Sequence, residues 1–371
     1  MDWLLFLIGL MTALGLVASL LPFVPLPHGI FRVGEFPRVQ ILVWSLVALL
    51  LTLALLPWHG DGSGWTWAFV LVNLVSIGVQ LWFIRSFTPL SRHRVRDFVP
   101  EDHPADTPLV RMLAANVKLS NRDYDRLCAL VMTCDPDIAV FMEVDDEWIS
   151  ALDAVTADYP HRIVEAQDNG YGMMLVSRAE LVEHEIKHLL NPEVPSFHCT
   201  VRLGPQDTFR LVALHPEPPS IKHDTIGRDA EIGMVGLEMR ERDEAAVVFG
   251  DLNDVAWSAT TRRFLRLSRM LDPRHGRGQF NSFDARYPFA RWPLDHIFVT
   301  PHFEIVGLRR MPHIGSDHFP MFYELALTDR EAARVEDDPA TEDDFEDVDD
   351  LVETERGRER RPVGVDWEDE D

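Results

Sequence analysis

The sequence contains little cysteine and almost no lysine. Only three cysteines (Cys128, Cys134 and Cys199) occur in 371 residues, and no two of them have CxxC spacing. So few cysteines exclude a scaffold held together by disulfides and a cysteine-rich zinc module. The chain has only three lysines, so nearly all of its basic groups are arginines.

Charged residues are absent from three apolar stretches, at residues 3–21, 39–57 and 65–84. Each stretch has roughly the 20 residues that an α-helix needs to cross about 30 Å of hydrocarbon. Tryptophans gather near their ends, as they do at membrane interfaces. Buried core helices and a cleaved signal peptide are the alternatives, but three such runs separated by short loops argue against both. We therefore predict a three-helix transmembrane anchor in residues 1–84.

Arginines flank the predicted helices on one side only. Arg32 and Arg38 lie between the first and second stretch, and four more arginines follow the third within residues 85–96. Three crossings place both groups on the same side of the membrane, and flanks rich in arginine usually face the cytoplasm. The sequence therefore predicts that the remainder of the chain is cytoplasmic.

Acidic residues are concentrated at the C-terminal end. Residues 329–371 contain 20 acidic residues and 6 arginines, a net charge of −14 out of −25 for the whole chain at pH 7. A segment with this charge and few apolar residues buries too little surface to fold. We predict an acidic, disordered tail there, and the milder charge of the remainder does not exclude nucleic acid as a partner.

Residues 109–328 have the pattern of a globular α/β domain. Helical patterns that open with capping residues occur at 121–134, 224–242 and 258–271. Short apolar runs bounded by turn residues predict strands at 109–117, 137–144, 172–177, 209–214, 245–250, 295–300 and 319–327. Because some predicted strands are adjacent in sequence, the pattern favours a layered sandwich over a regularly alternating barrel. Residues 85–108 form a basic and polar linker.

Acids, amides and histidines stand at the ends of these predicted strands, where a β scaffold carries functional side chains. They are Asn116, Glu143, His215, Asp251, Asn253, Asp295, Asp317 and His318. Each alone is weak evidence, because an acid at a strand end is commonly a turn former and a histidine is commonly structural. Their order along the chain is more specific.

In that order, these residues resemble the motifs of the endonuclease/exonuclease/phosphatase superfamily. The most specific motifs are GDLN at 250–253, LDHIF at 294–298 and GSDHFP at 315–320. The HPEPP motif at 215–219, together with the three apolar stretches, is similar to the bacterial membrane-anchored branch that includes the teicoplanin-resistance membrane protein. The resemblance implies a four-layer α/β sandwich, with two mixed β-sheets flanked by helices, and an integral protein of the bacterial inner membrane. That branch generally places its catalytic domain outside the membrane, which conflicts with the arginine pattern.

The resemblance also implies a hydrolase of phosphate esters that depends on Mg²⁺ or Mn²⁺. It makes Glu143 the principal metal ligand, with Asn116 and Asp317 in or beside the metal shell. Oxygen ligands of this kind suit a hard cation such as Mg²⁺, which also takes substrate phosphate as a ligand.

Five further roles follow from the same resemblance. It makes His318 the general base and Asp295 the partner that fixes its tautomer. Asp251 orients the attacking water or helps to protonate the leaving group. Asn253 and His215 bind the phosphoryl oxygens. Whether Asp251 or His318 activates the water stays open.

Eight arginines and only two acids lie between residues 262 and 291. This run is either a solvated helix face and loop or a basic rim for a nucleic-acid backbone or anionic lipid headgroups. On the second interpretation, Arg262, Arg266, Arg291 and Trp292 are candidate substrate-binding residues, since an aromatic ring can stack on bases.

The sequence thus predicts a membrane-anchored phosphoesterase that acts on a phosphodiester or phosphomonoester. Its substrate class stays open between nucleic acid and a lipid phosphate such as a polyprenyl diphosphate. A catalytically inactive membrane scaffold is a third hypothesis, which the complete set of catalytic residue types disfavours. No protein partner follows from the sequence.

Overall fold

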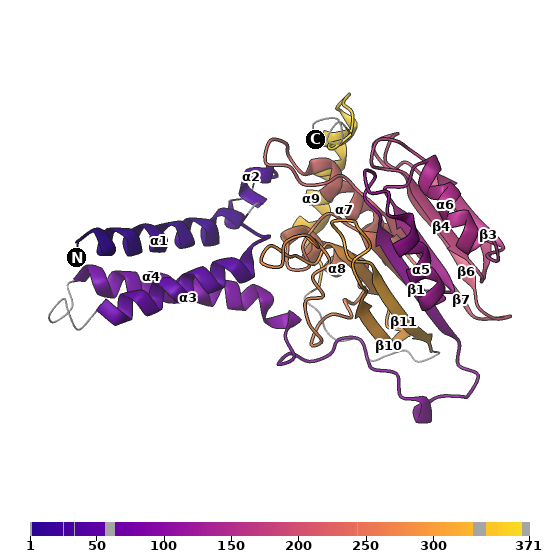
Figure 1. The fold of residues 1–371 in the computed structure, drawn as a ribbon, viewed down its shortest axis with the longest axis horizontal. Helices are drawn as coiled ribbons and strands as arrows, with labels where there is room; N and C mark the ends of the chain where they lie inside the picture. The colour runs from indigo at the N-terminus through magenta and orange to yellow at the C-terminus, as the bar shows by residue number, and fades with distance from the viewer. Residues whose placement is uncertain are drawn as a thin grey trace.

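The computed structural model describes residues 2–24, 26–32, 34–55, 64–242, 244–328 and 339–365. Three long helices lie side by side and extend from one side of a larger α/β body (Figure 1). They are α1 (Asp2–Leu20), α3 (Arg38–Leu55) and α4 (Gly64–Ile84). Each is long and apolar enough to cross a membrane, which confirms the three predicted apolar helices. The end of the second predicted stretch, from residue 56, lies outside the described residues.

The three helices turn apolar side chains outward and polar side chains toward one another. Phe6, for example, is 74% exposed. Between the helices, Asn73 Nδ2 donates a hydrogen bond to Thr12 Oγ1 at 2.9 Å, and Gln80 Nε2 donates one to Ser19 Oγ at 2.9 Å. This arrangement is the reverse of a soluble bundle and is typical of helices that pack in lipid.

The body contains two mixed β-sheets, as predicted. The first has the order β10 (Phe303–Arg310), β11 (Met321–Leu327), β1 (Leu109–Asn116), β2 (Ile138–Met142), β4 (Met173–Ser177), β3 (His161–Glu165). The second has the order β5 (Glu180–Lys187), β6 (Ser196–Arg202), β7 (Thr208–Leu214), β8 (Ala246–Asp251), β9 (Asp295–Val299). β1 pairs with β2 and β7 with β8 in parallel, and the other neighbouring strands are antiparallel.

Neighbouring side chains along each central strand face two different hydrophobic cores, one between the sheets and one beneath the helices. On β1, Met112 faces the core between the two sheets, while Leu113 faces a second core beneath α5 (Tyr124–Cys134) and α6 (Asp146–Thr156). On β8, Val247 faces the core between the sheets, while Val248 faces a core beneath α7 (Ile226–Arg240) and α8 (Ala259–Ser268). The period of two in a strand sends neighbouring side chains to opposite faces. The result is the helix–sheet–sheet–helix sandwich that the sequence predicted.

The predicted disorder of the tail is wrong for residues 342–356, which form helix α9 (Glu342–Arg356) against α7 and α8. Thr341 and Asp344 form a capping box at its start. Asp344 pairs with Arg266 of α8, and Val348 is fully buried against Gly233 of α7. Composition alone cannot predict this helix. The acidic residues would repel one another in isolation, but in the fold they pair with arginines that are distant in sequence. Residues 329–338 and 366–371 of the predicted tail lie outside the described residues.

The anchor and the body meet through the segment that joins α1 to α3. The indole nitrogen of Trp257 donates a hydrogen bond to the Glu35 carbonyl at 2.6 Å, and the Thr225 amide donates one to the Pro27 carbonyl at 2.8 Å. Short helices here and in the linker are η1 (Leu21–Phe23), α2 (Gly29–Arg32), η3 (Arg85–Phe87) and η4 (Pro100–Asp102). This segment holds part of the anchor against the body.

Candidate active site

Five of the predicted site residues meet because strands from both sheets end at one edge of the sandwich. Asn116 is the last residue of β1, Asp251 is the last of β8, and Glu143 and His215 directly follow β2 and β7. β9 runs antiparallel to β8, so its first residue, Asp295, lies opposite Asp251. Parallel strands end at the same edge and an antiparallel neighbour begins there, so the sheet topology itself gathers these side chains.

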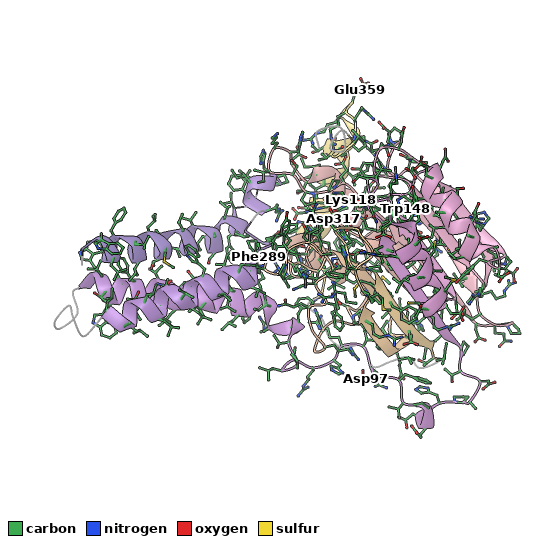
Figure 2. The ribbon with its side chains drawn as sticks, viewed as in Figure 1. Asp97, Lys118, Trp148, Phe289, Asp317 and Glu359 are labelled. Carbon is green, nitrogen blue, oxygen red and sulfur yellow. The ribbon has the colours of Figure 1, made fainter. Side chains whose placement is uncertain are left out.

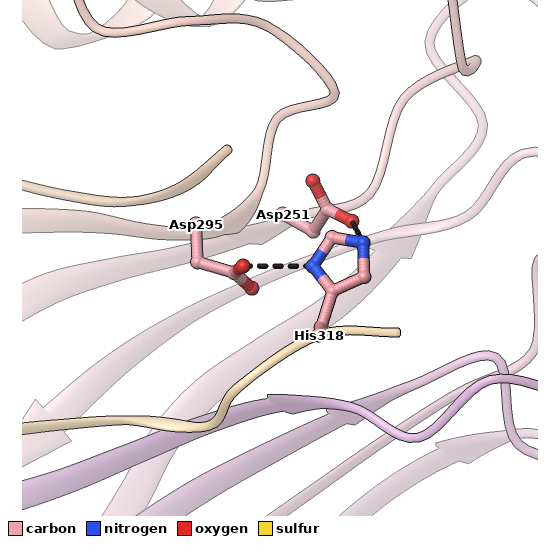
Figure 3. Close-up of side chains that lie close together, drawn as sticks. All are labelled: Asp251, Asp295 and His318. Atoms are coloured by element: carbon pink, nitrogen blue, oxygen red, sulfur yellow. Dashed lines mark hydrogen bonds and ion pairs between the residues drawn. The ribbon is translucent and has the colours of Figure 1, made fainter. Parts of the chain in front are cut away.

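His318 lies between two carboxylates (Figure 3). Its Nδ1 lies 2.8 Å from Asp295 Oδ2, and its Nε2 lies 3.4 Å from Asp251 Oδ2. Burial by itself lowers the pKa of His318, but the two carboxylates outweigh it and raise the pKa to about 10. Burial raises the pKa of Asp251. The three groups form one electrostatic unit.

Asn116 joins Asp251 to the second acidic group of the site. Its Nδ2 donates to Glu143 Oε1 at 2.7 Å and to Asp251 Oδ2 at 3.0 Å, while its Oδ1 accepts from the Lys118 amide at 3.0 Å. Glu143 Oε2 also accepts from the Leu119 amide at 3.1 Å. Burial and the neighbouring Asp317 raise the pKa of Glu143 to about 7. Asn116 therefore orients both carboxylates, and its amide oxygen is already engaged by the backbone.

His215 and Asn253 complete the floor of the site. His215 Nε2 lies 4.0 Å from both Glu143 Oε1 and Asp251 Oδ2, and burial lowers its pKa to about 4. The His215 ring is therefore neutral at neutral pH and keeps one N–H donor. Asn253 Nδ2 donates to the Pro216 carbonyl at 2.9 Å, which uses one of its two hydrogens.

The chain bends sharply where it carries these side chains. Glu143 and Asn253 have positive φ angles of 62° and 53°, which non-glycine residues seldom adopt. Gly250 has φ 137°, and a Cβ on it would lie 2.1 Å from the Leu214 carbonyl oxygen. Backbone strain of this kind persists where the surrounding structure enforces it, as at functional sites.

Gly250→Ala is therefore expected to destabilise the protein by about 3 kcal/mol or more, since it adds a backbone clash to an unfavourable φ. Thermal unfolding measures the effect. Gly64→Ala is the matched control, because a Cβ at Gly64 meets no atom within 4 Å. Equal melting temperatures for the two variants would contradict the prediction.

The site opens into a pocket of about 560 Å³ with walls from three distant parts of the chain. Glu143, His215, Asn253, Asp317 and His318 line it, and the more deeply buried Asn116, Asp251 and Asp295 stand behind them. The segment between α1 and α3 contributes Gly29, Arg32, Phe36 and Pro37, and the C-terminal segment contributes Val363 and Gly364.

The predicted substrate-binding residues are not brought together. Trp292 lines the pocket. Arg262 instead lies over the Phe83 ring at 4.6 Å, and Arg291 donates to backbone carbonyls. Arg266 forms an ion pair with Asp344. Among the described residues that line the pocket, these three arginines do not appear. The local density of arginine does not reveal these contacts, because the partners are distant in sequence or belong to the backbone.

Two cations beside Asp317 in the described pocket were not predicted as site residues. Lys118 Nζ and Arg286 Nη2 each lie 3.6 Å from Asp317 Oδ2, and both residues line the pocket. Lys118 and Asp317 lie together at the centre of the body (Figure 2). Lys118 stands two residues after Asn116, and Arg286 belongs to the run of arginines, so both signals were present in the sequence.

Comparison with known proteins accounts for this arrangement. Residues 112–318, more than half of the chain, match the model of the Endonuclease/Exonuclease/phosphatase family. The chain belongs to that family. Its enzymes hydrolyse phosphate esters and depend on a divalent metal ion. No curated protein matches the sequence.

Several solved structures are similar to the body of the protein. TDP2 from D. rerio, complexed with a single-strand DNA product, is 17% identical, with a TM-score of 0.49 over 58% of this chain and 98% of that chain. The mannosyl-6-phosphatase from Bacteroides thetaiotaomicron is 18% identical, with a TM-score of 0.47 over 59% of this chain and 100% of that chain. A family member from Beutenbergia cavernae is 17% identical, with a TM-score of 0.48 over 60% of this chain and 72% of that chain.

Two sets of residues at the site offer ligand atoms to a divalent cation. Those of Asp251, Asp295 and His318 all lie within 4.8 Å of one another. Glu143 and Asp317 instead face the pocket, and their mutual repulsion and the burial of Glu143 favour a counter-charge between them. Carboxylate oxygens that line the pocket fit a hard cation that also binds substrate, whereas in the first set Asp251 and Asp295 do not line the pocket and His318 is hydrogen-bonded to Asp295.

Proposed function

We propose that the protein is a membrane-anchored, Mg²⁺-dependent phosphoesterase of the bacterial membrane-anchored branch. The observation that carries the proposal is that the hydrogen-bonded pair of Asp295 and His318 reaches the same pocket as the open carboxylates of Glu143 and Asp317. A bound Mg²⁺ would neutralise charge on the phosphoryl oxygens. Side chains of this protein would activate the water and bind the phosphoryl oxygens.

Asp295 holds the Nδ1 proton of His318 and leaves Nε2 to act on a water molecule. Asp251, beside Nε2, would orient that water or protonate the leaving group, so either His318 or Asp251 activates the water. The raised pKa of His318 reflects uncompensated negative charge around it, and a cation beside Glu143 would lower that pKa toward the range of an effective base. His215 and Asn253 each keep a donor for the phosphoryl oxygens.

The position of the pocket supports a lipid phosphate as substrate. Phe36 and Pro37, at the start of the second apolar helix, line the same pocket as His318. Phe289 lies between the body and the three helices, and its carbonyl accepts a hydrogen bond from Gln40 of α3 at 2.9 Å (Figure 2). A phosphate presented by a membrane lipid would reach the site along this side.

The ion pairs of the body weaken the nucleic-acid alternative. Most arginines of the predicted basic rim contact acids of the chain itself, as the pairs of Arg263 with Asp347 and Arg277 with Asp97 show. Paired arginines offer less charge to a phosphate backbone, since affinity for nucleic acid grows with the number of phosphates neutralised.

A substrate panel tests the proposal. The full-length protein in detergent micelles with Mg²⁺ is offered polyprenyl diphosphate, phosphoinositide, plasmid DNA, RNA and bis(p-nitrophenyl) phosphate. We expect hydrolysis of a lipid phosphate at a higher kcat/KM than of either nucleic acid. Preferential cleavage of DNA or RNA would establish the nuclease instead, and no turnover of any compound would support the inactive scaffold.

We expect the catalytic domain to lie in the cytoplasm, because all six arginines that flank the apolar helices fall on its side. Fusions of alkaline phosphatase and of green fluorescent protein after Arg96 and after Asp371 measure the orientation. Fluorescence without phosphatase activity at both positions is the expected result. Active phosphatase with dark fluorescent protein at both would place the domain outside, as is usual in the resembling branch.

A further inference from the structure

The segment that follows α9 runs back to the catalytic pocket. Val363 and Gly364 line that pocket beside Tyr171 and His215, about 150 residues or more away in sequence. The segment lies on the α7 and α9 side of the body (Figure 1). No catalytic role assigned above uses it.

A buried ion pair holds the segment in place. Arg360 donates to both oxygens of Glu217, at 2.7 and 2.8 Å, and also pairs with Glu355 at 2.7 Å. The Val363 amide donates to Glu217 Oε1 at 3.3 Å. Glu217 is only 4% exposed, so removal of the guanidinium would leave a buried carboxylate without its counter-charge.

The residues that bind the segment also shape the pocket. Glu217 stands two residues after His215, at the start of a loop whose residues 218–221 line the pocket. The hydroxyl of Tyr171, a second lining residue, donates to the Val363 carbonyl. The Tyr171 ring lies 5.8 Å from the His215 ring. The segment therefore closes one side of the pocket and fixes two of its walls.

Part of the docking of α9 uses contacts that this segment does not make. Val348 packs against Gly233, and Asp344 pairs with Arg266, at the opposite end of the helix. A chain that ends after Gly357 keeps these contacts and loses the pairs of Arg358 and Arg360 with Glu355.

We propose that residues 358–364 are a specificity-determining wall of the catalytic pocket, which admits small phosphate headgroups and excludes extended phosphodiester chains. The proposal rests on the phosphoesterase function proposed above. The segment lines the pocket beside Tyr171, next to His215, while Trp292 lines it beside Phe283, next to His318. An extended strand that enters past Trp292 would therefore meet the wall, whereas a terminal headgroup would not.

Three variants test the wall. One chain ends after Gly357, and a second carries Arg360→Ala. The third, Arg202→Ala, is the control, because Arg202 pairs with Glu180 at the surface, at the end of β6 away from the segment. The kcat/KM is measured for bis(p-nitrophenyl) phosphate and for a single-stranded oligonucleotide. We expect the oligonucleotide-to-small-ester ratio to rise ~10-fold in the first two variants and to stay constant in the control.

Hydrogen exchange shows whether the wall has moved. Faster exchange in residues 358–364 of Arg360→Ala, with the remaining sheet unchanged, is the expected result. An unchanged substrate ratio in both variants, with the segment released, would overturn the proposal. An unchanged exchange rate in Arg360→Ala would show that Arg360 does not hold the segment. The substrate ratio of the chain that ends after Gly357 would then test whether the segment excludes the oligonucleotide.

A binding measurement distinguishes failure of the proposed wall from failure of the proposed phosphoesterase function. A fluorescent single-stranded oligonucleotide is titrated into each protein in EDTA, where turnover plays no part. If the wild-type protein hydrolyses neither compound, the proposed function fails, while tighter oligonucleotide binding by the two variants still supports the wall. Equal oligonucleotide binding by the wild type and the three variants would contradict the proposed wall and leave the proposed phosphoesterase function unaffected.

Discussion

Glu143→Ala is expected to abolish turnover while the protein stays folded. Glu143 faces the pocket and contributes no apolar core volume, so its loss removes a ligand atom rather than packing. A metal ion stabilises charge in the transition state by several kcal/mol, so we expect a loss of ~10³-fold or more in kcat. EDTA should abolish the activity of the wild-type protein, and Mg²⁺ or Mn²⁺ should restore it.

Two variants make this experiment specific. Glu143→Gln keeps the shape of the side chain and an oxygen for the Leu119 amide, and it removes the negative charge together with the oxygen that accepts from Asn116. Glu185→Ala removes an exposed glutamate from β5 and should leave kcat unchanged. Circular dichroism confirms that each variant is folded. Full activity in EDTA, or in either Glu143 variant, would contradict the proposed metal site.

The apolar helices could be predicted closely because the signal is local. A run of about 20 uncharged residues can be recognised without knowledge of any contact, and residues 3–21 and 65–84 agree with α1 and α4 within one residue. The central strands were also predictable, since burial on both faces gives a continuous apolar run. β8 (Ala246–Asp251) was predicted as 245–250.

The strands that the sequence analysis missed lack that signal. β5, β3 and β10 are edge strands, and β5 is mostly exposed and carries three glutamates. Charged residues at an edge prevent pairing with other chains, but they also remove the apolar alternation by which a strand is recognised. β6, the neighbour of β5, was missed as well, since its polar residues interrupt any apolar run.

The residues of the site also divide into those that the sequence predicts and those that it does not. The motif residues were predictable because each stands beside a recognisable strand. The walls of the pocket were not, since Phe36 and Val363 reach it only through the tertiary fold. Long-range pairing also explains the misjudged arginines: Arg266 and Asp344 are 78 residues apart, and no local window contains both. The same long-range ion pair helps to hold α9 in place, in a segment for which the sequence predicted disorder.

Asp295→Asn and His318→Ala are expected to have large and strongly coupled effects. Asn at position 295 presents the wrong partner to the Nδ1–H of His318, and the equivalent change in a Ser-His-Asp triad lowers kcat by ~10⁴-fold. His318→Ala should cost at least as much. The double variant should lose far less than the product of the two single losses, because the two side chains act as one unit. His184→Ala, on the exposed surface of β5, is the control.

The pKa of His318 gives this prediction a readout besides turnover. In the wild-type protein in EDTA, burial lowers that pKa, but Asp251 and Asp295 raise it to about 10. Asp295→Asn removes one of the two charges, so the pKa measured by NMR of the imidazole should fall. A histidine pKa raised from 6.5 stabilises the folded state fully below pH 6.5, and this contribution is lost as the pH rises toward about 10. The variant should therefore be less stable than the wild type at low pH and approach it at high pH. Fully multiplicative kinetic losses, with an unchanged His318 pKa, would mean that Asp295 and His318 act separately.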